Sequence, residues 1–303
     1  MPVALDIDRL RARTLDTSRM EVTWETSSST VDALDYTFQV LRSESSEGPW
    51  DALTPEFSDR YIFVDGRVPS SDRFRQLWYK LRVKRKSDSS TKDFGPVMNE
   101  PEADLVAQYI RRAEQTLFTQ AIGRAVWLFP RRTFGFRCTN CWDKVLSAKK
   151  IANCIACFDT SFVRGYMNPI EVWMQIDPVA RAKQLQSQQQ DQQQLTTARM
   201  TFYPLVKPGD VIVEAENRRW RTVAVTPTER LRAVIKQELT LRAIQPTDIE
   251  YKLPINLTEA LRDIQPSPGR MFTNPHTLDS AIEERTPNVF ANYTTFPGMP
   301  DED

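Results

Sequence analysis

Two Cys-x-x-Cys pairs lie within one stretch of 20 residues and constrain this chain more than any other feature. The pairs are Cys138 with Cys141 and Cys154 with Cys157, and twelve residues separate them. Two short turns of this kind can present four thiolates to one ion, as in structural zinc sites. We therefore predict a Zn²⁺ ion bound by Cys138, Cys141, Cys154 and Cys157. Four protein ligands leave no open coordination position, so the predicted site is structural rather than catalytic.

Other uses of the four cysteines stay open at this stage. The thiols could be reduced and metal-free, could form disulfides, or could hold an iron–sulfur centre. Their close spacing is unlike the disulfide framework of a secreted domain and favours a reducing compartment. Redox chemistry of the thioredoxin type is disfavoured, because no strand–helix–strand pattern surrounds either pair.

The scarcity of glycine and histidine excludes most common catalytic motifs. The chain has nine glycines in 303 residues, and the closest two are Gly123 and Gly135. GxGxxG, Walker A and GxSxG motifs all need glycines within a few residues of one another. His276 is the one histidine, so neither a His-based triad nor HExxH can be built on two imidazoles. We predict that the chain is not an enzyme; a glycosidase with two carboxylates is the remaining enzyme hypothesis, for which no acidic pair stands out.

The length allows two or three domains, and the first 98 residues are predicted to form a β-sandwich. Apolar residues alternate with polar ones in three segments, as in half-buried antiparallel strands. The inward residues are Met20, Val22 and Trp24, then Tyr36, Phe38 and Val40, then Leu77, Tyr79, Leu81 and Val83. The order and spacing of these segments resemble a fibronectin type III domain, which implies a spacer or an adhesive surface and places Trp24 and Tyr79 in the core.

A linking helix is predicted over residues 99–123. Asn99 offers an N-cap, Pro101 suits the first turn, and Gly123 marks the end. Apolar residues recur at intervals of three and four, which predicts one face packed into a core rather than a groove for a partner. This stripe comprises Leu105, Val106, Tyr109, Ile110, Ala113, Leu117 and Phe118.

The predicted zinc-knuckle segment, residues 124–180, is locally basic. Between residues 124 and 165 eight Arg or Lys stand against two Asp, a net charge of +6, whereas the whole chain has 40 basic and 40 acidic residues. Basic zinc ribbons with aromatic side chains can bind nucleic acid, and we consider that contact possible here. The alternative is that the aromatics form the small core of the knuckle and the charges face an acidic protein. The aromatics are Phe134, Phe136, Trp142 and Phe158.

The C-terminal part contains three predicted regions. Residues 181–198 are glutamine-rich and are predicted to be a linker. Residues 199–263 alternate like an antiparallel meander and predict a small β-barrel. Residues 264–303 carry spaced prolines and aromatics and are predicted to form an extended tail that can lie across a neighbouring subunit. The fold class is thus mainly β: sandwich, long helix, four-cysteine zinc knuckle and small barrel.

The barrel segment contains a hairpin pattern made by Gly209, Asp210, Arg219, Trp220, Val223 and Val225. With this pattern the segment resembles virion structural proteins of tailed bacteriophages, in particular the β-barrel of head-completion (stopper) proteins. The stretch from Cys154 to Ile170 also looks like knuckle segments of phage virion proteins.

That resemblance implies a structural role in the neck, or head–tail connector, of a virion assembled in the host cytoplasm. It also implies a homo-oligomeric ring and contacts with portal, adaptor or tail-terminator proteins. The alternatives are a position in the baseplate or tail, and a nucleic-acid-binding zinc-ribbon protein.

No membrane association is predicted. The sequence contains no apolar run of about 20 residues, the length that a spanning helix requires. The N-terminal residues Met1 to Asp6 also lack the basic region and the apolar run of a signal peptide.

Overall fold

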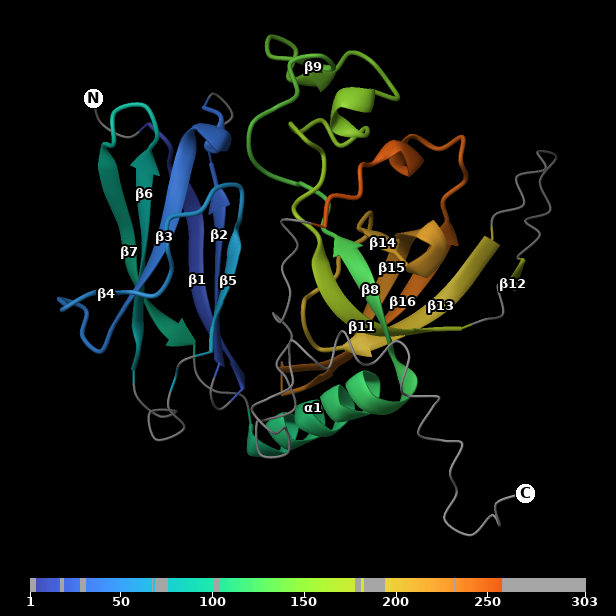
Figure 1. Ribbon diagram of the computed structural model, residues 1–303, viewed down its shortest axis with the longest axis horizontal. Coiled ribbons are helices and arrows are strands. Elements are labelled where there is room, and N and C mark those ends of the chain that lie inside the picture. Colours follow the sequence, from blue (N-terminus) through green and yellow to red (C-terminus); the bar gives the residue numbers. More distant parts are fainter. Residues whose placement is uncertain are drawn as a thin grey trace, which may run out of the picture. The chain divides into compact units, whose positions relative to one another are not determined.

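The computed structural model describes residues 4–16, 19–27, 31–66, 68, 76–100, 104–177, 181–182, 194–231 and 233–257. The chain is mainly β, as predicted: its described residues form a curled N-terminal sheet, the helix α1 and a closed C-terminal barrel (Figure 1). They also include a cluster of four cysteines. The extended tail with His276 and most of the glutamine-rich stretch lie outside the described residues.

The N-terminal sheet has the order β4-β3-β6-β7-β1-β2-β5. Its described strands pair antiparallel except β1 with β7, which run parallel where Ala12 faces Asn99 and Arg13 faces Glu100. The sheet is therefore mixed, and its two halves curl around one core. The strands are β1 (Ile7–Asp16), β2 (Arg19–Thr26), β3 (Tyr36–Ser43), β4 (Asp51–Ala52), β5 (Ile62–Asp65), β6 (Trp78–Arg85) and β7 (Thr91–Glu100).

The inward faces predicted for this sheet are confirmed. Every inward residue named above for the N-terminal strands is buried in one core cluster, Trp24 and Tyr79 included. The Trp24 and Phe38 rings pack with centroids 5.8 Å apart, and the Tyr79 hydroxyl donates a hydrogen bond of 3.0 Å to Asp65. Buried aromatics of this size dominate the stability of a small core.

The helix begins later than predicted. Asn99 lies in β7, where its side-chain oxygen accepts a hydrogen bond from the backbone N–H of Leu77. Asp104 is the N-cap of α1 (Leu105–Leu117), and its carboxylate accepts from the N–H of Val106. A π-helical turn, η3 (Phe118–Ile122), extends the helix to Gly123, as predicted. A Cβ at Gly123 would lie 2.3 Å from the carbonyl oxygen of Phe118, so the chain needs glycine at this exit.

The prediction that the apolar stripe of the helix packs into a core is wrong for most of its residues. Tyr109 is 75% exposed and Leu105 61% exposed, and Val106, Ala113 and Leu117 are exposed as well. The helix instead packs through its other side, where Ala107 meets Ala233 and Ile235 of β16. A small residue at that contact lets the helix approach the strand closely. Ile110 of the stripe packs against the same contact and Phe118 is buried, while the other five residues of the stripe are left outward.

The C-terminal barrel is closed by six antiparallel strands in the order β11-β8-β14-β15-β16-β13, with β11 pairing β13. Its interior is filled by aliphatic side chains from all parts of the circuit, including Leu128, Met174, Met200 and Leu241. The strands are β8 (Arg124–Phe129), β11 (Ile170–Ile176), β13 (Gln194–Thr201), β14 (Val211–Val213), β15 (Arg219–Arg230) and β16 (Ala233–Ala243); β12 (Arg181–Ala182) pairs with β13.

The barrel therefore begins earlier than residue 199, where the sequence placed its start. β8 and β11 come from the segment predicted to be the zinc knuckle, and β13 begins within the glutamine-rich stretch. Without β8 and β11, β14 and β13 would be exposed edges, and closure removes both. Residues 130–169, which we call the cysteine segment, are an insertion between these two barrel strands (Figure 1).

None of the helices within the described ranges meets the length and hydropathy that a bilayer-spanning helix requires.

Candidate metal centre

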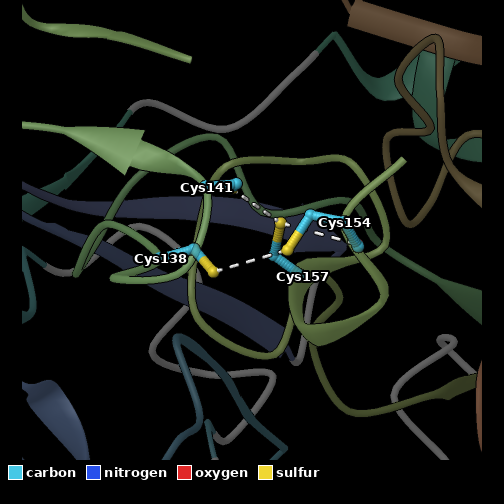
Figure 2. A group of neighbouring side chains, drawn as sticks. All are labelled: Cys138, Cys141, Cys154 and Cys157. Atoms are coloured by element: carbon cyan, nitrogen blue, oxygen red, sulfur yellow. Dashed lines mark hydrogen bonds between the residues drawn. The ribbon is translucent and has the colours of Figure 1, made fainter. Parts of the chain in front are cut away.

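The four cysteines that the sequence singled out come together in the cysteine segment (Figure 2). Their Sγ atoms all lie within 4.8 Å of one another. The Cys138 and Cys154 sulfurs are 4.0 Å apart, and those of Cys141 and Cys157 are 3.4 Å apart. A tetrahedron with metal–sulfur bonds of about 2.3 Å has sulfur–sulfur edges of about 3.8 Å. The arrangement therefore fits a four-thiolate metal site, and all four cysteines are free of disulfides.

Short turns hold each cysteine pair. In the first pair, the carbonyl oxygen of Cys138 accepts a hydrogen bond of 3.0 Å from the N–H of Trp142, which begins the small hairpin β9 (Trp142–Asp143) and β10 (Ala148–Lys149). In the second pair, the 3₁₀ turn η4 (Ile155–Cys157) ends at Phe158, whose φ is +47°. Both turns bring the two sulfurs of a pair to the same side, which is what one ion requires.

Hydrogen bonds around Cys157 fix the second turn. The Thr160 hydroxyl donates a hydrogen bond of 2.8 Å to the carbonyl oxygen of Cys157, and the backbone N–H of Thr160 donates a second hydrogen bond to the same oxygen. Gly165 passes beside this carbonyl with φ +69°, and a Cβ there would lie 2.4 Å from the oxygen. The sequence analysis missed Thr160 and Gly165, since no general motif marks the residues that support a Cys-x-x-Cys turn.

An Asp159 carboxylate ties the two halves of the segment together. It accepts a hydrogen bond of 2.8 Å from the N–H of Asn153, immediately before Cys154, and pairs with Lys149 of β10. These contacts hold the second cysteine pair against the hairpin that follows the first. Outer contacts of this kind orient the ligands of a metal site.

The thiols differ in their readiness to ionise. Burial raises the pKa of the Cys141 and Cys157 thiols. Burial acts in the same direction on Cys154, but hydrogen bonds from the backbone N–H of Ala156 and from neighbouring thiols outweigh it and lower the pKa. Four thiolates repel one another in a buried cluster, and a bound cation would remove that cost while displacing the protons.

The aromatic side chains of the segment have intramolecular partners. The Arg137 guanidinium lies 4.1 Å from the ring centroids of both Trp142 and Phe162. Phe158 packs against Tyr166, with centroids 6.3 Å apart. Phe134 packs instead against Tyr61 in the core of the N-terminal sheet, so the aromatics do not share one core within the knuckle.

Most basic side chains of residues 124–165 also have acidic partners. Five of the eight form ion pairs, which leaves Arg131, Arg137 and Lys144 without one among the described residues. The two acidic partners from outside the segment, Asp59 and Glu214, reduce its net charge from +6 to +4, so a positive charge remains and nucleic-acid contact stays a prediction. The pairs are Arg124–Glu214, Arg132–Asp59, Arg164–Asp59, Lys149–Asp159 and Lys150–Asp143.

The hairpin residues behind the phage resemblance have structural positions in the barrel. Gly209 and Asp210 directly precede β14. The indole N–H of Trp220 donates a hydrogen bond of 2.8 Å to the carboxylate of Glu214. The Arg219 guanidinium donates to the carbonyl oxygens of Tyr251 and Leu253, which fastens the segment after β16 to the barrel. Val225 packs against the barrel core and Val223 is exposed.

No protein-family model matches this chain. No curated protein matches it either. The phage resemblance therefore stays a prediction that depends on these hairpin residues and on the stretch after Cys154.

Proposed function

We propose that this chain is a structural component of a tailed-phage virion, placed in the neck, where copies form a ring that holds neighbouring proteins. The observation that carries the proposal is the outward apolar face of α1, with Leu105, Tyr109 and Leu117 exposed by 61%, 75% and 43%. Covering one large apolar side chain stabilises an interface by about 1.5–3 kcal/mol. A face of this kind is typical of a protein–protein contact.

The cysteine segment supports the same role with a second apolar surface. Val145 and Leu146 in the β9–β10 turn are 91% and 74% exposed, and Ile151 and Ile155 beside the second cysteine pair are 55% and 58% exposed. A segment of about 40 residues is too small to bury a sufficient core of its own. In this proposal Zn²⁺ bound by the four thiolates supplies the missing folding energy and holds these side chains outward.

The barrel suits a ring because its strand edges are closed within the chain. Because no strand edge is open, contacts between copies are made by side chains rather than by unpaired backbone groups. Copies related by rotation can then pack through the same two apolar surfaces, the α1 face of one copy and the cysteine segment of the next. The resemblance of its hairpin to stopper proteins is what favours the neck over other positions in the particle.

Locating the chain in purified particles tests the proposal directly. We expect antibody labelling or cryo-electron microscopy to place it as a ring between head and tail. Its absence from the particles would refute the virion assignment, and a position at the distal end of the tail would move it to the baseplate.

Self-association tests the role of the α1 face. We expect Tyr109→Glu to shift the purified chain from oligomer towards monomer in sedimentation velocity. Gln120→Glu is the matched control, because it adds the same charge at another exposed helical position. An unchanged distribution for Tyr109→Glu, or a wild-type chain that is monomeric at all concentrations, would show that the face does not join copies of this chain.

A further inference from the structure

A hollow of about 330 Å³ opens on the barrel wall where three arginines from different parts of the chain converge. Arg131 follows β8, Arg221 lies in β15 and Arg242 lies in β16. Gly209, in the turn before β14, also lines it. The hollow lies apart from the four cysteines.

The two strand arginines face each other directly. Arg221 and Arg242 are cross-strand partners in the β15–β16 ladder. Like charges at directly opposed positions destabilise an antiparallel pair, so their presence here needs a compensating anion. Part of the compensation is internal: Arg221 pairs with Glu250 at 2.8 Å and Arg242 with Asp248 at 3.6 Å.

Arg131 adds a third positive charge with no acidic partner within 4.0 Å among the described residues. A Cβ at Gly209 would lie 2.9 Å from its Cδ and 3.0 Å from one of its terminal nitrogens. Only glycine therefore lets the Arg131 side chain lie across this turn. The nearby Asp210 carboxylate is already occupied, because its two oxygens accept from the backbone N–H groups of Arg131 and Lys207.

The β15 strand is irregular beside the hollow. Its pairing with β16 shifts register between Thr222 and Ala224, and the residue between them, Val223, lines the hollow. Such irregularities often occur beside binding sites, where they redirect side chains.

We propose that this hollow binds an oxyanion of the phosphate class, with Arg131, Arg221 and Arg242 as its cationic partners. A carboxylate is satisfied by one bidentate arginine, and Arg221 and Arg242 each have one already. A phosphate group offers at least three strong acceptor oxygens and up to two negative charges, which suits three guanidinium groups. The hollow is larger than a bare phosphate ion, so it has room for the group that carries the phosphate.

Calorimetric titration of the full chain tests this binding, with inorganic phosphate and with adenosine monophosphate as probes at constant ionic strength. We expect saturable binding, and we expect Arg131→Gln to weaken it about 10- to 100-fold, the loss of one charge-assisted contact. Arg218→Gln is the control, because Arg218 is an exposed arginine directly before β15 that does not line the hollow. Stronger binding of the nucleotide than of free phosphate would identify a phosphate ester as the ligand.

Thermal stability separates binding from folding. The Arg131 guanidinium has no ion pair among the described residues, so Arg131→Gln should keep the melting temperature of the wild type while phosphate binding weakens. An absence of saturable phosphate binding in the millimolar range, equal weakening by Arg131→Gln and Arg218→Gln, or tighter binding of an acidic peptide than of phosphate would overturn the proposal.

Discussion

The carboxylate of Asp210 accepts a hydrogen bond of 2.8 Å from the backbone N–H of Arg131 and so joins the turn before β14 to the end of β8. The other carboxylate oxygen of Asp210 accepts a hydrogen bond of 2.7 Å from the backbone N–H of Lys207. Asp210 is 2% exposed, and this burial raises its pKa from 3.8 to about 6, although both N–H donors act in the opposite direction. The strand exit that leads into the cysteine segment is thus held by a group that titrates near neutral pH.

Stability should therefore fall as this group ionises. A carboxyl whose pKa is higher in the folded than in the unfolded state stabilises the fold below pH 3.8, and that contribution is lost as pH rises to about 6. A shift of about two units corresponds to about 3 kcal/mol. Between about pH 4 and about pH 6.5 we expect the free energy of unfolding of the wild type to fall by about this amount relative to Asp210→Asn.

Denaturant unfolding of both proteins across this pH range measures the difference. Other carboxylates titrate alike in the two proteins and cancel. At neutral pH Asp210→Asn should still be less stable by about 1–3 kcal/mol, because an amide can accept from only one of the two N–H groups through its oxygen. A difference that does not vary with pH would contradict the raised pKa.

Gln237 of β16 holds the loop after β13 inside the barrel. Its side-chain oxygen accepts from the N–H of Val206, and its amide donates to the carbonyl oxygens of Thr201 and Pro204. Gln237→Leu leaves three buried backbone groups unpaired, so we expect a loss of about 3 kcal/mol or more in unfolding free energy. Glu238→Gln, on the exposed side of the same strand, should change stability by less than about 0.5 kcal/mol. Similar stabilities for the two variants would show that the network is unimportant.

Gly165 should be indispensable to the cysteine segment. Alanine there would have to adopt φ +69° and would place its Cβ 2.4 Å from the carbonyl oxygen of Cys157. The left-handed conformation alone costs about 1–2 kcal/mol, and the clash adds to it, so Gly165→Ala should lower both the melting temperature and the affinity for Zn²⁺. Gly66→Ala is the control, because no atom lies within 4 Å of a Cβ there. Equal behaviour of the two alanine variants would rule out the proposed constraint.

Removal of one thiolate should release the metal. We expect the wild-type chain to bind one Zn²⁺ and Cys154→Ser to bind it at least about 100-fold more weakly, since even the loss of an outer partner of a ligand costs about 10- to 100-fold. Ile155→Ser changes the neighbouring exposed residue without touching a ligand and should leave the affinity intact. Elemental analysis and competition with a chromophoric chelator measure both. Undiminished zinc in Cys154→Ser would exclude the four-thiolate site. Iron bound to the wild-type chain would instead identify the site as an iron–sulfur centre.

The parts of this protein that the sequence predicted are those governed by local geometry. Alternation with a period of two placed Trp24, Phe38 and Tyr79 on inward faces, because successive side chains of a strand point to opposite sides whatever the strand pairs with. The four cysteines could be found in the same way, since a Cys-x-x-Cys turn brings its two sulfurs together within four residues. The two pairs then meet because only a short hairpin, β9 with β10, separates them along the chain.

What the sequence could not decide depends on which surfaces meet. The apolar stripe of α1 was visible, but its orientation was not, because periodicity shows that Leu105 and Tyr109 share a face without showing what that face contacts. Closure of the barrel by β8 and β11 links residues on either side of a 40-residue insertion, and the opposition of Arg221 to Arg242 depends on the register of a long hairpin. Pairings between distant residues result from the packing of the whole chain, so only the tertiary structure determined them.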